Sequence, residues 1–173
     1  MKRMIPAAIT LSLLLPPLVL PLGAMAALPV TDFVVQAIKS DNAQILIGSL
    51  AQMRGQTQAV KDLGLTLVRD RTNTRMQMLA VAKALHVTVP PAPGAAAAAA
   101  YKKLAKLSGT AFDRAFLAEV IDNQKEDIAA IREHTGEAKG EAGEITRKRL
   151  AVVEKHLTLA HAAQSSEGAA AVQ

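Results

Sequence analysis

The chain lacks cysteine and tryptophan, and it has only one tyrosine and three phenylalanines among its 173 residues. Without cysteine, packing and not disulfide bonding must hold the fold. The same absence excludes the attachment of a lipid to cysteine that occurs in bacterial lipoproteins. Proteins that bind single-stranded nucleic acid stack the bases on aromatic side chains. The scarcity of aromatic residues therefore argues against a nucleic-acid partner.

Motifs that carry enzyme chemistry are also missing. No glutamate precedes Glu119, and the chain has no glycine-rich phosphate loop. Ser108-Gly109 follows no strand of the kind that supports a catalytic serine. No segment alternates with a period of two for long enough to form a half-buried strand. We therefore predict a helical protein that is not an enzyme, with no catalytic residue and no cofactor.

The first 26 residues have the features of a secretory signal peptide. Lys2 and Arg3 precede an uncharged, leucine-rich run over residues 4–22, and Ala24-Met25-Ala26 supplies the small residues that signal peptidase reads. A membrane anchor is the alternative, but four prolines interrupt the run: Pro6, Pro16, Pro17 and Pro21. We predict cleavage after Ala26. Export without cysteine favours a bacterial periplasm.

The remaining residues are enough for one domain with a hydrophobic core. We assign residues 27–164 to this domain, and residues 165–173, which are small and polar, to a flexible tail. Loss of Lys2 and Arg3 lowers the formal net charge from +5 to +3. A charge this small is weak support for any anionic partner.

Helix-favouring and helix-breaking residues divide the domain into five segments. Long helices are predicted over 32–54, 57–86, 110–135 and 141–164, and a short helix over 95–107. The expected N-caps are Thr31, Thr57 and Thr110, and Gly55 and Gly136 are expected to end the first and fourth helices. Tight connections make each pair of long helices an antiparallel hairpin.

A long connection joins the two hairpins. It spans 87–109, holds the short alanine-rich helix, and contains Pro90, Pro91 and Pro93, which cannot continue a helix. Four long helices with one long crossover form the ferritin-like topology. We predict an all-α, ferritin-like four-helix bundle of two antiparallel hairpins. How the crossover packs on the bundle stays open.

A polar residue interrupts the apolar stripe of each long helix near its middle. The second helix presents Val60, Leu63, Leu67, Arg71, Thr74, Met78, Val81 and Leu85, and the fourth presents Phe116, Val120, Gln124, Ile128 and Ile131. The fifth presents Ile145, Val152, His156 and Leu159, and the first presents Ile38, Gln44 and Ile47. The pattern predicts a buried polar layer of Gln44, Arg71, Gln124 and His156, with Asp41, Asp70 and Asp122 nearby.

Arg71 decides the chemistry of this layer, because a guanidinium is always cationic and only donates hydrogen bonds. Such a cation opposes a metal ion at the same place. We expect Arg71 to pair with Asp70 or Asp122, and Gln44 to bond with Gln124 across the bundle. A layer of this kind fixes the register of the helices more than it stabilises them.

Five motifs along the domain are informative together. They are Asp32-Phe33, Gln44-Ile45-Leu46-Ile47-Gly48, Leu67-Val68-Arg69-Asp70, Gly109-Thr110-Ala111-Phe112-Asp113-Arg114-Ala115-Phe116-Leu117 and Glu154-Lys155-His156-Leu157. In these motifs the chain resembles an exported bacterial family, the domain of unknown function 4142, and the resemblance extends over residues 31–163. The segment from Phe112 to Leu117 is the most specific part. The resemblance implies a ferritin-like helical fold.

The resemblance also implies a set of metal ligands inside the bundle. The family pattern has glutamate at position 44 and histidine at positions 71, 124 and 156, and this chain keeps only His156. A di-iron carboxylate bundle needs Glu from two helices and Glu-x-x-His from the other two. Here no acidic residue lies three residues before any histidine. We predict no metal site, the alternative being an atypical one of His156, Asp70 and Asp122.

Three functional hypotheses follow. The first is a periplasmic, non-catalytic module with a structural, stress-protective or protein-interaction role, whose partner is an unknown protein or a second copy of the chain. The second is a metal-binding or oxidoreductase bundle with its site around His156. The third is peripheral contact with an anionic envelope surface through Lys102, Lys103 and Lys106.

Overall fold

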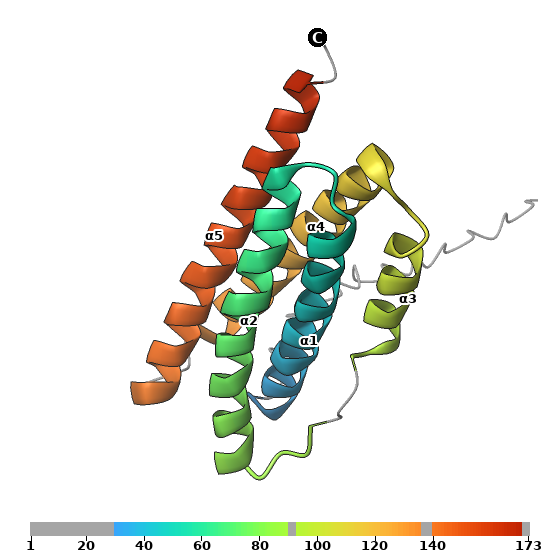
Figure 1. Cartoon of the computed structure of the whole chain (residues 1–173). Coiled ribbons are helices and arrows are strands. Elements are labelled where there is room, and N and C mark those ends of the chain that lie inside the picture. Colours follow the sequence, from blue (N-terminus) through green and yellow to red (C-terminus); the bar gives the residue numbers. More distant parts are fainter. Residues whose placement is uncertain (1–29, 90–92, 136–139, 171–173) are drawn as a thin grey trace, which may run out of the picture.

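The computed structural model describes residues 30–89, 93–135 and 140–170. Within these ranges the chain forms five α-helices and no strand: α1 (Val30–Arg54), α2 (Gln58–Ala84), α3 (Ala95–Leu104), α4 (Gly109–Thr135) and α5 (Gly140–Ala170) (Figure 1). The all-α prediction is confirmed. The predicted signal peptide lies outside the described residues. No helix in the described ranges is long and apolar enough to span a membrane.

The helices pack as two pairs that lie side by side. The most extensive contacts join α1 to α2 and α4 to α5, and further contacts join α1 to α4 and α2 to α5. The short helix α3 lies outside these four and packs against α1 and α4 (Figure 1). The sequence did not show how the crossover packs. In the structure, the helix of the crossover folds back along one face of the long helices.

Two glycines bring α1 and α2 into close contact. A Cβ atom added to Gly64 would lie 2.6 Å from the carbonyl oxygen of Gly48, and one added to Gly48 would lie 2.8 Å from that of Gly64. Both obstacles are backbone atoms, which cannot rotate away. The two helices therefore cross at a distance that only glycine permits.

The turn between α1 and α2 is held by Asp113 of α4. The predicted N-cap Thr57 is confirmed, since its hydroxyl oxygen accepts a hydrogen bond from Val60 N at 3.4 Å. Asp113 is fully buried and accepts hydrogen bonds from Gln56 N at 2.9 Å and from Thr57 N at 2.8 Å. The Thr57 hydroxyl donates to the same carboxylate at 2.9 Å. Asp113 thus ties the start of α4 to this turn.

Two of the predicted N-caps are wrong, whereas the predicted end of the first helix before Gly55 is confirmed. Helix α1 already includes Thr31, and Thr110 is the second residue of α4, so neither is an N-cap. Thr110 instead donates its hydroxyl hydrogen to Gln56 Oε1 at 3.2 Å, and Gly109 before it has a φ of +60°. Gly55 follows α1 without a positive φ. Position 55 has no room for a side chain, because a Cβ atom added to Gly55 would lie 2.7 Å from Ala51 O. The predicted stop at Gly136 lies outside the described residues.

Helix α2 ends two residues earlier than predicted. His86 has a φ of +54°, its N–H donates to Lys83 O at 3.2 Å, and Val87 N donates to Ala82 O at 2.8 Å. These bonds close the last turn in the manner of a Schellman motif. The short helix likewise ends at Leu104 and not at residue 107.

Helix α5 continues to Ala170, six residues beyond the predicted end. The predicted end of the fifth helix at residue 164 is therefore wrong, and α5 includes residues 165–170 of the segment that was assigned to a flexible tail. Glu167 and the alanines of this stretch favour the helix. Ser166 donates its hydroxyl hydrogen to Ala163 O at 2.7 Å, which removes its competition with the helical backbone. Residues 171–173 lie outside the described residues.

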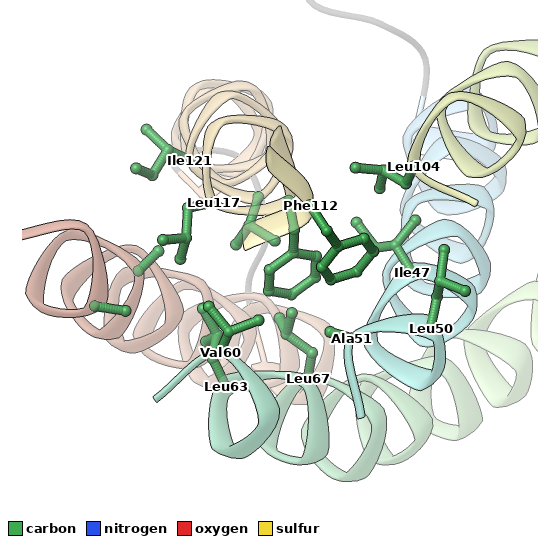
Figure 2. Packing of buried hydrophobic residues seen from close by; sticks show 14 residues of the cluster. Ile47, Leu50, Ala51, Val60, Leu63, Leu67, Leu104, Phe112, Leu117 and Ile121 are labelled. Carbon is green, nitrogen blue, oxygen red and sulfur yellow. The ribbon is translucent and has the colours of Figure 1, made fainter. Parts of the chain in front are cut away.

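Two apolar clusters fill the space between the helices. One lies towards the α1–α2 turn and gathers Ile47, Leu50, Ala51, Val60, Leu63, Leu67, Leu104, Phe112, Phe116, Leu117, Val120, Ile121, Ala160 and Ala163 (Figure 2). The other gathers Phe33, Val34, Ala37, Ile38, Met78, Ala82, Ile128, Ile131 and Val153. Polar residues between these two sets in every long helix separate the clusters, and they form the candidate site.

Candidate functional site

Four charged side chains, one from each long helix, meet at the centre of the fold. Arg71 Nη1 of α2 donates to Asp41 Oδ1 of α1 at 3.1 Å and to Asp127 Oδ2 of α4 at 2.7 Å. Arg149 Nη1 of α5 donates to Asp41 Oδ2 at 2.7 Å, and its Nη2 lies 3.8 Å from Asp127 Oδ2. Two guanidinium groups and two carboxylates therefore form one ion-pair network with no net charge.

Neutral side chains extend this network along α1 and α4. Arg71 Nη2 donates to Gln124 Oε1, and Gln124 Nε2 donates to Gln44 Oε1 at 3.0 Å. Ser40 donates its hydroxyl hydrogen to Asp127 Oδ2 at 2.9 Å. Arg149 Nη2 also donates to the carbonyl oxygen of Ala37 at 3.2 Å.

The network is almost completely shielded from solvent. The side chains of Asp41 and Arg71 are 0 % exposed, that of Arg149 is 1 % exposed and that of Asp127 is 13 % exposed. Burial opposes the charge on Arg149, but Asp41 and Asp127 outweigh that effect and raise the pKa of its guanidinium. A buried charge without a partner is very costly. Each of the four charged groups therefore has an oppositely charged partner inside the fold.

His156 lies beside the network and bonds with Asp70. Its Nε2 is 3.2 Å from Asp70 Oδ2, while Lys155 Nζ and Arg69 Nε donate to the same carboxylate at 3.0 Å and 2.8 Å. Burial, together with the positive charge of Arg71, lowers the pKa of His156 to about 4. Burial acts to raise the pKa of Asp70, but the bonds from Arg69, Lys155 and His156 outweigh it and hold that pKa well below its usual range. At neutral pH the imidazole is thus neutral and donates from Nε2.

Two buried polar atoms at this point have no partner among the described residues. They are Arg71 Nε, which is a donor, and His156 Nδ1, which is an acceptor when Nε2 carries the hydrogen. A buried polar group left unpaired costs roughly 1–3 kcal/mol. The polar layer is therefore not the arrangement that would maximise stability, which agrees with a role in fixing how the helices align.

The structure buries all four residues of the predicted polar layer, namely Gln44, Arg71, Gln124 and His156. It joins the first three by hydrogen bonds, including the predicted bond between the two glutamines. The predicted partners of Arg71 are wrong, because it pairs with Asp41 and Asp127. Asp70 lies with His156 instead, and Asp122 is exposed on α4.

Sequence reasoning missed Arg149 and Asp127. The predicted apolar stripe of the fifth helix included Leu159, which is 38 % exposed, and the buried face in fact consists of Thr146, Arg149, Val153, His156, Ala160 and Ala163. This face is made mainly of small and polar residues, so a search for leucine and isoleucine selected a stripe of which only His156 is fully buried. The usable signal was the spacing, since Arg149 lies seven residues before His156 and on the same face.

The residues at the centre do not fit a metal ion. A metal needs lone pairs, whereas the two guanidinium groups present only N–H donors and already occupy both carboxylates. The atypical alternative of His156, Asp70 and Asp122 is also not assembled, because Asp122 is exposed on α4. In the part of the chain that the structure describes, no three histidine, aspartate or glutamate side chains group around a common point.

The basic residues of α3 face outwards. Lys102 and Lys103 in α3, and Lys106 just after it, are all exposed. The opposite side of α3 carries Leu104, which is buried in the cluster of Figure 2. This short helix is therefore anchored by Leu104 and the partly buried Tyr101, and it presents its lysines to solvent.

Comparison with known families gives one match. Residues 22–163 match the model of a family whose description is Domain of unknown function (DUF4142). The chain belongs to this family. No curated protein and no solved structure is significantly similar to it. Membership of the DUF4142 family carries no activity with it, so the function has to be argued from the geometry of the site.

Proposed function

We propose that this DUF4142 protein is an exported, non-catalytic helical module with a structural, stress-protective or protein-interaction role. The ion-pair network carries the proposal. Asp41, Arg71, Asp127 and Arg149 satisfy one another at the centre of the fold, where a metal-dependent bundle would need free ligands. The network takes the place of a metal centre and links all four long helices.

A ferritin-like bundle is the topology that we propose for this fold. Two helix pairs, joined by α1–α4 and α2–α5 contacts and connected through a segment that carries α3, support it. The bundle would then be a member of the ferritin-like class in which charged pairs have replaced the metal site. The role of such a scaffold lies in what its surface binds.

Periplasmic location rests on the sequence of the first 26 residues and on the absence of cysteine. The mature protein would begin near Ala27. Mass spectrometry of protein isolated from the periplasm tests this, and we expect a mass that lacks residues 1–26. Recovery of the uncleaved chain in the membrane fraction would contradict export by a cleaved signal.

Exposed apolar side chains support a protein partner or self-association. Met53, Leu65 and Met76 are 72 %, 55 % and 55 % exposed, and the last two lie on α2. Partner-binding surfaces are enriched in methionine and other large apolar residues. Peripheral contact with the envelope through Lys102, Lys103 and Lys106 is a further part of this proposal.

Photo-crosslinking tests the interaction role. A photoreactive residue replaces Leu65 or Met76, and the exposed polar position Gln77 on the same helix serves as the control. We expect crosslinked products at Leu65 and Met76 and fewer at Gln77, with a product of twice the chain mass if the partner is a second copy. Equal or absent crosslinking at all three positions would contradict a docking role for α2.

Thermal unfolding tests the claim that no metal supports the fold. The mature protein should unfold at the same temperature with and without added Fe(II), Mn(II) or Zn(II), because the network offers no free ligand. A rise in unfolding temperature that grows with metal concentration would indicate a site that binds the native state, and would overturn the proposal.

A further inference from the structure

A half-open cavity of about 440 Å³ lies between α1, α4 and the start of α3. It has a size at which proteins bind small molecules. Its floor includes Gln44 and Asp127, so it opens onto the edge of the ion-pair network. The two sides of this cavity differ in charge.

The α4 side is acidic. Glu119, Glu126 and Asp127 line it, together with Asn123. Asp127 is partly neutralised, because its Oδ2 accepts from Arg71 and from Ser40. Glu119 and Glu126 have no ion-pair partner among the described residues. This side therefore favours a positively charged group.

The opposite side offers hydrogen-bond donors and a cation. Lys39 of α1 lines the cavity and has no ion-pair partner in the described ranges. Gln44 is only 1 % exposed and lines the cavity. Its Oε1 accepts from Gln124, and its Nε2 makes no hydrogen bond to a described residue. A buried amide group of this kind favours a ligand that accepts a hydrogen bond.

The start of α3 adds to this donor side. Its N-cap is Gly94, so no side chain caps the first N–H groups of the helix. Gly94, Ala96 and Ala97 all line the cavity. The first N–H groups of a helix lack intrahelical acceptors and carry partial positive charge. With the Gln44 amide and Lys39, they make a place suited to a carboxylate.

We infer that this cavity binds a small zwitterion of the basic amino-acid class. The carboxylate lies towards Lys39, Gln44 and the start of α3, and the ammonium groups lie towards Glu119 and Glu126. The excess of carboxylates over ammonium in the lining favours a ligand with net positive charge. This inference concerns binding only and is independent of the proposed non-catalytic role.

Calorimetry with three matched probes tests the charge requirement on the mature chain. L-lysine carries a carboxylate and two ammonium groups. Cadaverine is the same molecule without the carboxylate, and L-norleucine is the same molecule without the side-chain ammonium. We expect L-lysine to bind about tenfold more tightly than either analogue, because each omits one charge-assisted contact. Equal affinity for all three, or no binding of L-lysine at millimolar concentration, would overturn the inference.

Matched variants locate the site. Lys39→Met and Glu126→Gln should each weaken L-lysine binding by about tenfold. Lys102→Met and Glu133→Gln, which change exposed residues outside the cavity, should leave the affinity unchanged. Circular dichroism confirms that each variant is folded. If the cavity variants bind L-lysine as tightly as the controls do, the ligand lies elsewhere and the assignment is wrong.

Discussion

At the scale of single residues, the main feature of this protein is the pairing of two guanidinium groups with two carboxylates at the centre of the fold. Arg71 and Arg149 both contact Asp41, so the buried carboxylate balances two cations that come from different helices. Removing one member of such a network leaves charge without a partner. The network is therefore where substitution is most costly.

Asp41→Asn should destabilise the protein by about 3–5 kcal/mol, because it leaves Arg71 and Arg149 to share Asp127 alone in a buried site. Urea unfolding followed by circular dichroism measures the change. Asp122→Asn, at an exposed position on α4, is the control and should change the stability by less than about 0.5 kcal/mol. An Asp41→Asn cost no greater than that of the control would show that the network is not a structural unit.

His156 makes the stability depend on pH. Its pKa in the folded state is lowered to about 4 from the usual value of about 6.5, so the unfolded chain binds the proton more readily. Stability from this group is present above pH 6.5 and is lost as the pH falls towards 4, by an amount on the order of 3 kcal/mol. His156→Gln should remove this part of the pH dependence in urea titrations between pH 7 and pH 4.

His161→Gln provides the matched control for this measurement, since His161 is exposed on the same helix. Its pH profile should follow that of the unmodified protein. A His156→Gln variant that keeps the full loss of stability between pH 6.5 and pH 4 would contradict a neutral, buried imidazole.

The polar layer was predictable in part at this scale. Gln44, Arg71 and Gln124 stand out in the sequence because each interrupts an apolar stripe. The ion pairs cannot be recognised in this way, because their members are brought together only by packing. Arg71 lies 30 residues from Asp41 and 56 residues from Asp127, and Arg149 lies 108 residues from Asp41. Arg149 escaped notice because its neighbours on the buried face of α5 are small or polar and lack the strong apolar signal of the other helices.

At the scale of elements, the number and order of the helices follow from the sequence, but several of their ends do not. Glycine and proline mark where a helix must stop, which is why the turn after α1 and the crossover were predicted. Thr110 was mistaken for a cap because its real partner, Gln56, belongs to a distant turn. The end of α5 was placed too early because composition alone does not reveal its contacts.

The crossing of α1 and α2 yields a prediction at this scale. In an isolated helix alanine is favoured over glycine by roughly 1 kcal/mol. Gly64→Ala should nevertheless destabilise the protein by about 1–3 kcal/mol, because the new Cβ would lie 2.6 Å from the backbone oxygen of Gly48 and force the helices apart. The midpoint of urea unfolding measures the effect.

Gly168→Ala in α5 is the control for this substitution, because a Cβ at Gly168 meets nothing within 4 Å. It should leave the stability unchanged or raise it slightly. A Gly64→Ala variant that is as stable as Gly168→Ala would mean that the helices cross at a greater distance than described.

The last part of α5 also responds to pH. Burial, and then the charge and hydrogen bonding of Asp113, raise the pKa of Glu167, while Arg114 acts in the opposite direction. A raised pKa means that Glu167 supports folding below pH 4.5 and loses that support as the pH rises through its raised value. Glu167→Gln should therefore raise the unfolding temperature at pH 7 and have little effect at pH 4. An unchanged or lower temperature at pH 7 would contradict the contact with Asp113.

At the scale of the whole molecule, the described residues form four long helices that enclose two apolar clusters with a charged layer between them. The all-helical fold and the DUF4142 family follow from the sequence with little ambiguity. The interior chemistry departs from the ligand set that the family resemblance implies. We therefore propose that ion pairs keep the helices in register and that the protein acts through its surface and its α1–α4 cavity.

The metal content of the mature protein tests this account most directly. The protein should be purified from periplasm without chelator and without a metal-affinity tag, and then measured by elemental analysis. The account predicts iron, manganese, zinc and copper far below one equivalent per chain, because Arg71 and Arg149 occupy the carboxylates at the centre. A near-stoichiometric amount of any of these metals, lost in a His156→Ala or Asp41→Asn variant that remains folded, would contradict it.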